Sequence, residues 1–165
     1  MKRRTFLLSG AAALLGASTY GLVLGGRSSA TETGSFPLQL SDAEWRERLS
    51  KPQYDVLRDH ATERAFTSPL DNEKRDGIFH CAGCDQAVYS SETKFDSGTG
   101  WPSFYEALPD AVGTQEDNSL FMTRTEVHCS NCGGHLGHIF NDGPQPTGKR
   151  HCINGVAMTF KPQDA

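Results

Sequence analysis

The chain has 165 residues, of which 36% are hydrophobic, and it contains 17 glycines and 8 prolines. This length and composition favour one loop-rich globular domain and exclude a collagen, a coiled coil or a wholly disordered chain. The net charge of -4 divides into +3 for residues 1–35 and -7 for residues 36–165. No cluster of basic residues follows Arg4, so we expect no binding to a nucleic-acid backbone.

The first 30 residues have the layout of an export signal. Residues 2–4 are basic and precede an uncharged stretch, residues 5–26, whose five glycines moderate its hydrophobicity. The layout resembles a twin-arginine signal with a cleavage site after Ala30, and it predicts an exported, periplasmic protein. An uncleaved membrane anchor is the alternative, because 22 uncharged residues can span a bilayer core of about 30 Å. We expect membrane contact only through this segment, then a linker at 31–36 and the functional domain at 37–165.

The functional domain is expected to begin with two short helices and to continue as strands. Ser41 and Glu44 form a capping-box pattern that predicts a helix over 41–49, and Pro52 suits the start of a second helix over 52–60. The rest of the domain consists of short apolar runs separated by turn-forming residues, which is typical of antiparallel strands joined by long loops. The expected strands are 78–79, 87–89, 120–127, 136–140 and 153–160.

Four of the five cysteines form two CxxC motifs that are separated by 44 residues. In each motif two thiolates can converge on one ion, and two such motifs complete a tetrahedral structural zinc site. Two disulfides are the alternative in an oxidising compartment. Zinc is favoured because closely spaced cysteines chelate a metal with less strain than they cross-link. The predicted ligands are Cys81, Cys84, Cys129 and Cys132.

The fifth cysteine, Cys152, is expected to be a reactive thiol rather than an inert buried one. Its neighbours Arg150 and His151 are potential cations that would lower the pKa of the thiol. Strand alternation places Asn154 on the same face as Cys152. The HLGH segment at 135–138 adds two imidazoles that can transfer a proton.

The remaining aromatic and histidine residues allow more than one interpretation. Trp101 stands between Gly100 and Pro102 on a constrained turn, where it can present its ring to a small apolar group, although a buried core tryptophan is the alternative. His135 can serve the reaction or support the nearby zinc cysteines. The other histidines are expected to be structural: His60, His80 and His128.

Four longer segments form a recognisable set. They are KFDSGTGWPSF at 94–104, GHLGHIF at 134–140, GPQPTG at 143–148 and RHCIN at 150–154. Together they resemble the peptide methionine-R-sulfoxide reductases of the B class, over about residues 37–162. The resemblance implies a mainly β fold of the β-tent type, with two antiparallel sheets and a structural zinc ion. It also implies reduction of methionine sulfoxide in proteins to methionine.

The resemblance further implies a role for each matching residue. Cys152 would be the nucleophile that attacks the sulfoxide sulfur and becomes a sulfenic acid, while protonated His138 would be the general acid toward the sulfoxide oxygen. Trp101 and Phe140 would pack against the substrate methyl group, so that only one epimer fits. The residues expected to orient water, acid and thiolate are His135, Asp142, Asn154 and Arg150.

Two positions depart from the pattern of many family members. His151 stands where many have tyrosine, and Thr99 stands where many have a resolving cysteine. With four thiols committed to zinc, the sulfenic acid would have no internal partner. Recycling is therefore expected to depend on an external thiol, either a thioredoxin-like protein or a small molecule.

Two other functions remain open from the residues alone. One is a zinc-ribbon binding module in which Cys152 is incidental. The other is a cysteine hydrolase with a Cys152–His138 dyad. Neither explains why the Trp101 turn and the paired histidines occur in one acidic chain with an export signal.

Overall fold

The computed structural model describes residues 36–119 and 122–163. The predicted export signal, the predicted cleavage site and all but the last residue of the predicted linker therefore lie outside the described residues. The described residues belong to one compact unit. Within them, no helix has the length and apolar character needed to cross a membrane.

Two short helices come first, as predicted. Helix α1 (Asp42–Arg48) begins with the expected capping box, in which the backbone N–H of Ser41 donates to Glu44 at 2.8 Å. Helix α2 (Lys51–Leu57) buries Leu57 and packs against β7 (His135–Phe140). It ends three residues before the predicted limit, because His60 adopts a left-handed φ of 56° that a helix does not allow.

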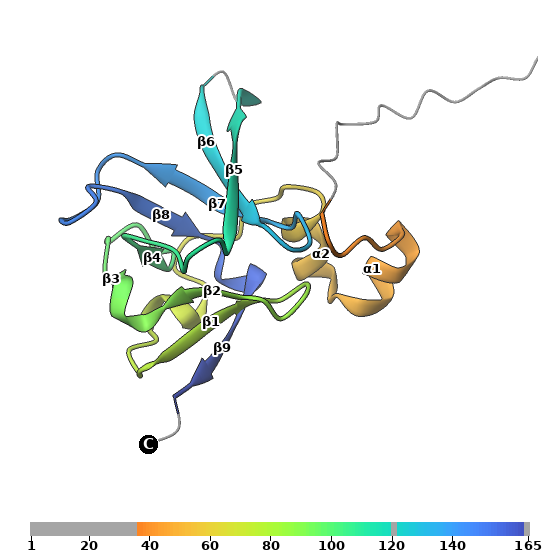
Figure 1. Cartoon of the computed structure of the whole chain (residues 1–165), viewed down its shortest axis with the longest axis horizontal. Coiled ribbons are helices and arrows are strands. Elements are labelled where there is room, and N and C mark those ends of the chain that lie inside the picture. The colour runs from red at the N-terminus through yellow and green to blue at the C-terminus, as the bar shows by residue number, and fades with distance from the viewer. Residues whose placement is uncertain (1–35, 120–121, 164–165) are drawn as a thin grey trace, which may run out of the picture. The chain divides into compact units, whose positions relative to one another are not determined.

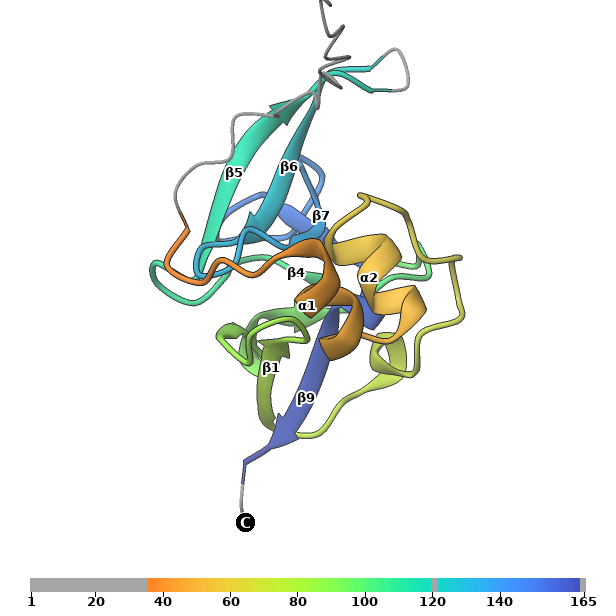
Figure 2. The ribbon, with the colours of Figure 1, turned by 90° about the vertical axis from the view of Figure 1, so that its right-hand side faces the viewer.

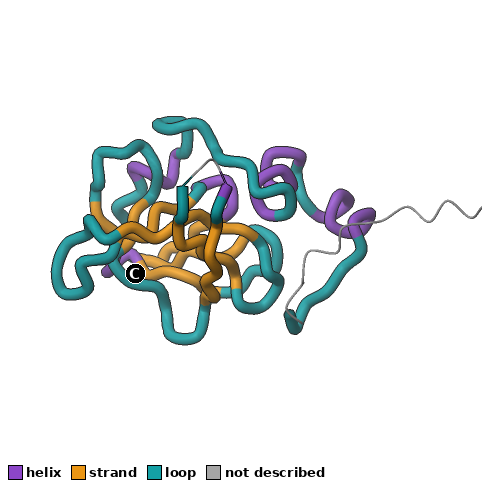
Figure 3. Tube along the Cα trace, turned by 90° about the horizontal axis from the view of Figure 1, so that it is seen from above, coloured by secondary structure: helices purple, strands orange, loops and turns teal. Residues whose placement is uncertain are grey.

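Nine strands of the described chain form two antiparallel sheets, which confirms the predicted mainly β fold (Figure 1). The three-stranded sheet has the order β2-β1-β9, and the six-stranded sheet has the order β3-β4-β8-β7-β6-β5. The remaining bounds are β1 (Gly77–Cys81), β2 (Ala87–Ser90), β3 (Lys94–Phe95), β4 (Ser103–Phe104), β5 (Val112–Asp117), β6 (Arg124–Cys129), β8 (Arg150–Ile153) and β9 (Met158–Pro162). The two helices lie side by side next to the sheets and outside the strands (Figures 2 and 3).

The predicted strands are only partly correct. The runs at 78–79, 87–89 and 136–140 fall inside β1, β2 and β7. The predicted strand over 120–127 is wrong in its bounds, because β6 begins at Arg124. The predicted strand over 153–160 is wrong because a 3-10 turn at Gly155–Ala157 divides it between β8 and β9, which belong to different sheets. Strand β5 was missed because it is a polar edge strand without an apolar repeat.

Aromatic rings from both sheets fill the core. Phe104 of β4 stacks on Tyr89 of β2 with ring centroids 4.4 Å apart, and it meets Phe79 of β1 edge-on at 5.0 Å. All three side chains are fully buried. Burying a side chain of this size stabilises a fold by about 1.5–3 kcal/mol, so these rings hold the two sheets together.

Strands β7 and β8 approach each other closely at Gly137, where a Cβ atom would lie 2.1 Å from the carbonyl oxygen of Cys152. We expect Gly137→Ala to destabilise the domain by about 1–3 kcal/mol, because the backbone must move to admit the methyl group. The measurement is the free energy of unfolding in urea. Gln115→Ala, at an exposed position of β5, is the control and is expected to stay within about 0.5 kcal/mol of the parent. Equal stability of Gly137→Ala and the control would contradict this reading of the strand contact.

Candidate functional site

Cys152 lies on β8, in the middle of the six-stranded sheet. In the strand register it is opposite His138 of β7 on one side and Ser103 of β4 on the other. The thiol opens into a pocket of about 140 Å³. The pocket is lined by Thr62, Trp101, Arg124, Gly137, His138, Phe140, Cys152 and Asn154. The structure thus brings together five of the residues that the sequence selected.

Two aromatic side chains form apolar walls of this pocket. Trp101 is partly exposed rather than buried in the core, and its indole Nε1–H donates to the carbonyl of Glu63 at 2.9 Å. Phe140 lies beneath Arg150, whose guanidinium carbon is 4.4 Å from the ring centroid. Both rings are thereby fixed in orientation beside the thiol, where they can receive a small apolar group.

The thiol of Cys152 is harder to ionise than the sequence suggested. Burial raises the pKa of Cys152, and the Thr99 hydroxyl and the charge of Arg150 offset this rise only in part. The Thr99 oxygen lies 3.9 Å from the Cys152 sulfur. Arg150 is itself paired with Asp142 through two hydrogen bonds of 2.9 and 2.8 Å. The positive charge of Arg150, which was expected to lower the pKa of the Cys152 thiol, is therefore partly neutralised by Asp142.

His151 does not supply the second cation that was expected beside Cys152. Its ring is buried, and its Nδ1 lies 3.0 Å from the hydroxyl of Tyr89. Burial, with a smaller contribution from the charge of Lys149, lowers the pKa of His151 to about 4. The ring is therefore neutral near pH 7, and the prediction of a cationic His151 is wrong.

His138 is held by an acidic residue that the sequence analysis did not select. Its Nε2 lies 2.7 Å from the carboxylate of Asp117, at the end of β5. The backbone N–H of Ser119 and the guanidinium of Arg124 also donate to this carboxylate, at 2.9 and 2.6 Å. These hydrogen bonds, above all those with Ser119, keep the pKa of Asp117 well below its usual range. Burial lowers the pKa of His138, and the hydrogen bond to Asp117 opposes that decrease.

The other predicted site residues lie around the pocket rather than against the thiol. The Nδ1 atom of His135 lies 2.7 Å from the buried carboxylate of Glu126. Asn154 lines the pocket, but its amide donates to the carbonyl of Leu136 and accepts from the N–H of Glu63. Asp142 is exposed and contacts Arg150. These residues fix the backbone and side chains that surround Cys152.

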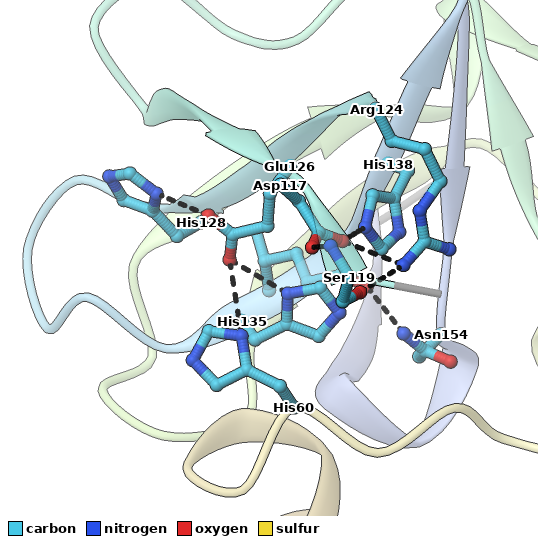
Figure 4. Close-up of polar contacts among 10 residues, drawn as sticks. His60, Asp117, Ser119, Arg124, Glu126, His128, His135, His138 and Asn154 are labelled. Atoms are coloured by element: carbon cyan, nitrogen blue, oxygen red, sulfur yellow. Dashed lines mark hydrogen bonds and ion pairs between the residues drawn. The ribbon is translucent and has the colours of Figure 1, made fainter. Parts of the chain in front are cut away.

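Strand β6 carries the residues that organise the histidines and that sequence reasoning missed. Arg124, Glu126 and His128 are alternate residues of β6, so they share one face. Arg124 contacts Asp117, while Glu126 lies between His128 and His135 (Figure 4). The alternation of charged residues is visible in the sequence, but it becomes informative only when β6 has its correct bounds.

The four CxxC cysteines converge as predicted. The sulfurs of Cys81 and Cys132 are 3.7 Å apart, those of Cys84 and Cys129 are 3.5 Å apart, and all four lie within 4.8 Å of one another. A tetrahedral zinc ion with Zn–S bonds of about 2.3 Å requires sulfurs about 3.8 Å apart. All four cysteines are free, so the two-disulfide alternative does not describe this structure. The cluster fits a structural metal ion.

Known proteins resemble this chain over most of the predicted functional domain. The family model described as "SelR domain" matches residues 49–162. "Peptide methionine sulfoxide reductase MsrB" of Agrobacterium fabrum is 54% identical over 123 residues, which cover 74% of this chain and 91% of that protein. The protein of the same name from Methanosarcina barkeri is 52% identical over 128 residues, covering 77% and 90%. The solved Mis18 "Yippee-like" domain shares 16% identity at a TM-score of 0.46, covers 55% of this chain and all of its own, and adds nothing to the assignment.

These matches decide between the functions that the residues left open. A family model over most of the domain and relatives at about half identity favour an oxidoreductase over a zinc-ribbon binding module or a cysteine hydrolase. The chain therefore belongs to the SelR-domain family, that of the peptide methionine sulfoxide reductases of the MsrB type.

Proposed function

We propose that this enzyme reduces the R epimer of methionine sulfoxide in proteins, with Cys152 as the nucleophile and an external thiol as the final reductant. The observation that carries the proposal is the pocket in which the Cys152 thiol, the His138 imidazole and the rings of Trp101 and Phe140 meet. These are the groups needed to attack sulfur, protonate oxygen and hold a methyl group.

The reaction begins with a proton transfer within the pair Cys152–His138. Both groups are neutral near pH 7, because burial raises the pKa of the thiol and lowers that of the imidazole. When the thiol proton moves to His138, the thiolate can bond to the sulfoxide sulfur while His138 returns the proton to the sulfoxide oxygen. The hydrogen bond to Asp117 stabilises the imidazolium that exists between these two transfers.

The products follow from the balance of atoms and electrons. After a second proton arrives from solvent, the sulfur–oxygen bond breaks, water leaves and the substrate sulfur remains bonded to the Cys152 sulfur. Water then attacks the Cys152 sulfur, methionine leaves, and one proton returns to solvent. The substrate sulfur has gained the two electrons that Cys152 has lost, and Cys152 is a sulfenic acid.

The preference for one epimer is attributed to the aromatic walls. With the methyl group against Trp101 and Phe140 and the sulfur facing Cys152, only one arrangement at the chiral sulfur directs oxygen toward His138. The other epimer would direct its oxygen away from the acid. Each lost interaction of this kind slows a reaction by about 10²–10⁴-fold.

Thr99 is the reason for proposing an external reductant. It stands 3.9 Å from the Cys152 sulfur, with a hydroxyl where a resolving thiol would be needed. The other four cysteines belong to the separate cluster. A first external thiol would form a mixed disulfide with Cys152 and release water, and a second would restore the thiol.

We expect a turnover assay on the separated epimers of a methionine-sulfoxide peptide to show reduction of the R epimer only. Without added thiol, the parent should form about one product per chain and then stop, since no second thiol is available. Cys152→Ser should lose activity while keeping its fold, and Thr99→Ser is the matched control that should retain it. Cys152→Ser activity within about tenfold of the parent would refute the assignment of the nucleophile.

The roles of Asp117 and His138 predict a specific pH dependence. The pair Cys152–His138 is reactive when it holds one proton, so the rate rises with pH through the pKa of His138 and falls above the pKa of Cys152. Asp117→Asn removes the carboxylate that opposes the effect of burial, and the pKa of His138 should fall further. We expect the acid limb of the pH profile of the single-turnover rate to move to lower pH. The maximum rate of that profile should fall by up to about tenfold for each unit by which the pKa of His138 is lowered.

The control for this profile is Glu116→Gln, which removes an exposed carboxylate next to Asp117. Its acid limb should coincide with that of the parent. An acid limb that moves to higher pH in Asp117→Asn would contradict the proposed protonation scheme.

Zinc is the metal that we propose for the four-cysteine cluster. When bound, it supplies cross-linking between the loops rather than chemistry, because four thiolates leave no open position. We expect Cys81→Ser to lower both the zinc content per chain and the midpoint of thermal unfolding, since metal binding contributes to folding stability. Cys152→Ser is the control that keeps the zinc ion of the four-cysteine cluster. Metal-free parent protein with two disulfides, detected by mass spectrometry, would contradict the proposal.

We also propose export through the twin-arginine route, so that the substrates are oxidised proteins outside the cytoplasm. The proposal is supported by the order of three regions in residues 2–30: basic residues, then an uncharged stretch, then small residues at the predicted cleavage site. Changing Arg3 and Arg4 together to lysine keeps the charge but alters the paired arginines. We expect the precursor to accumulate inside the cell in fractionation experiments, whereas unaltered export would favour the general secretory route or an anchor.

A further inference from the structure

A second group of potential metal ligands lies beside the reaction centre. Glu126 of β6 is 2% exposed, and its Oε1 is 2.7 Å from Nδ1 of His135 and 3.9 Å from Nδ1 of His60. The rings of the two histidines lie 4.9 Å apart. One ligand atom from each of the three residues lies within 4.8 Å of the others (Figure 4). The group has no part in the reaction proposed above beyond His135.

The charges of this group suit a cation. Burial by itself would raise the pKa of Glu126, but hydrogen bonds to His128 and His135 lower it to about 2, so the carboxylate is ionised. The ring of His60 is only partly shielded from water, and this partial desolvation lowers its pKa, so the ring is neutral near pH 7 with a lone pair available. The hydrogen bonds described for Glu126 come from imidazoles alone. A buried negative charge next to imidazole nitrogens is the electrostatic setting of a divalent metal site.

We infer that His60, Glu126 and His135 form a second metal site, which takes a divalent transition-metal ion such as Zn²⁺. Two histidines and one carboxylate are the ligand set of zinc sites that keep open positions. Bond lengths of about 2.0–2.1 Å require ligand atoms about 3.3 Å apart. The distances from Glu126 Oε1 to the nitrogens of His135 and His60, 2.7 and 3.9 Å, lie on either side of that value. His60 is 54% exposed and can rotate toward the carboxylate. A pocket of about 440 Å³, lined in part by these three residues, gives access from solution.

The backbone at His60 supports this arrangement. Its φ of 56° is in the left-handed region, and its ring lies 4.9 Å from that of His135 on β7. A glycine would adopt this conformation without strain. The backbone conformation at position 60 therefore does not explain why a histidine occurs there.

The site has a consequence for activity that rests on the proposed function. The ring of His135 lies 5.3 Å from that of His138. A cation on His135 adds positive charge next to the group that must become an imidazolium during the reaction, and like charges disfavour that form. Metal binding at this site therefore inhibits the enzyme reversibly, without contact with Cys152.

Binding is tested by equilibrium dialysis of the zinc-loaded full chain against Zn²⁺, with metal quantified per chain. We expect a second equivalent in the parent and in Cys152→Ser, and only one in His60→Ala. Asp59→Asn, which removes an exposed charge next to His60, is the matched control and should bind two. Excess Mg²⁺ should not compete, because it prefers oxygen ligands. One equivalent in the parent, or two in His60→Ala, would overturn the site.

Inhibition is tested separately from binding. His60→Ala should have the basal activity of the parent and should require at least tenfold more Zn²⁺ for half-inhibition. Equal inhibition of both proteins would place the inhibitory ion elsewhere, for example on the Cys152 thiol, and would overturn the regulatory role. If no sulfoxide is reduced but the second equivalent depends on His60, the proposed function fails while the metal site stands.

Discussion

The pairing of β7 with β8 is the constraint on which the rest of the site depends. It places His138 opposite Cys152 in adjacent strands, and the absence of a side chain at Gly137 allows the strands to come this close. β8 is also paired with β4, so the thiol is fixed from both sides. The position of the proposed nucleophile, Cys152, is therefore set by backbone hydrogen bonds, which leaves the surrounding side chains available to control protons and substrate.

Burial shifts the pKa values of the two groups that we propose to react, Cys152 and His138, in opposite directions. The pKa of Cys152 is raised and that of His138 is lowered, so the resting site carries no charge on either group. A neutral thiol is a poor nucleophile and is also less prone to unwanted oxidation. The hydrogen bond between Asp117 and His138 favours the charged form of the imidazole, which the proposed reaction requires.

The sequence predicted those features that depend on local pattern. The capping box of α1, the convergence of the CxxC motifs and the shared face of Cys152 and Asn154 follow from spacing alone. Strand β5 did not, because an edge strand needs no apolar face and its polar residues resemble a loop. Because β5 was not predicted, the contact between Asp117 and His138 could not be predicted either.

Electrostatic details were also beyond the sequence. His151 is next to Cys152 in the chain and was expected to act on it, yet strand alternation directs its ring toward Tyr89 in the core. Glu126 and His60 are far apart in the sequence, yet Oε1 of Glu126 lies 3.9 Å from Nδ1 of His60. Proximity in three dimensions, rather than along the chain, decides which charges a thiol or an imidazole experiences.

The four-cysteine cluster connects β1 of one sheet to β6 of the other, and the two motifs enclose 44 residues. That enclosed segment contains Trp101 and Arg124, whereas His138, Phe140 and Cys152 follow it. The pocket is thus formed both by residues of the segment between the two CxxC motifs and by residues that follow it. Closing a loop of this length removes about 4 kcal/mol of conformational freedom from the unfolded chain. A metal held by these sulfurs would thereby favour the joining of both halves of the pocket without lining it.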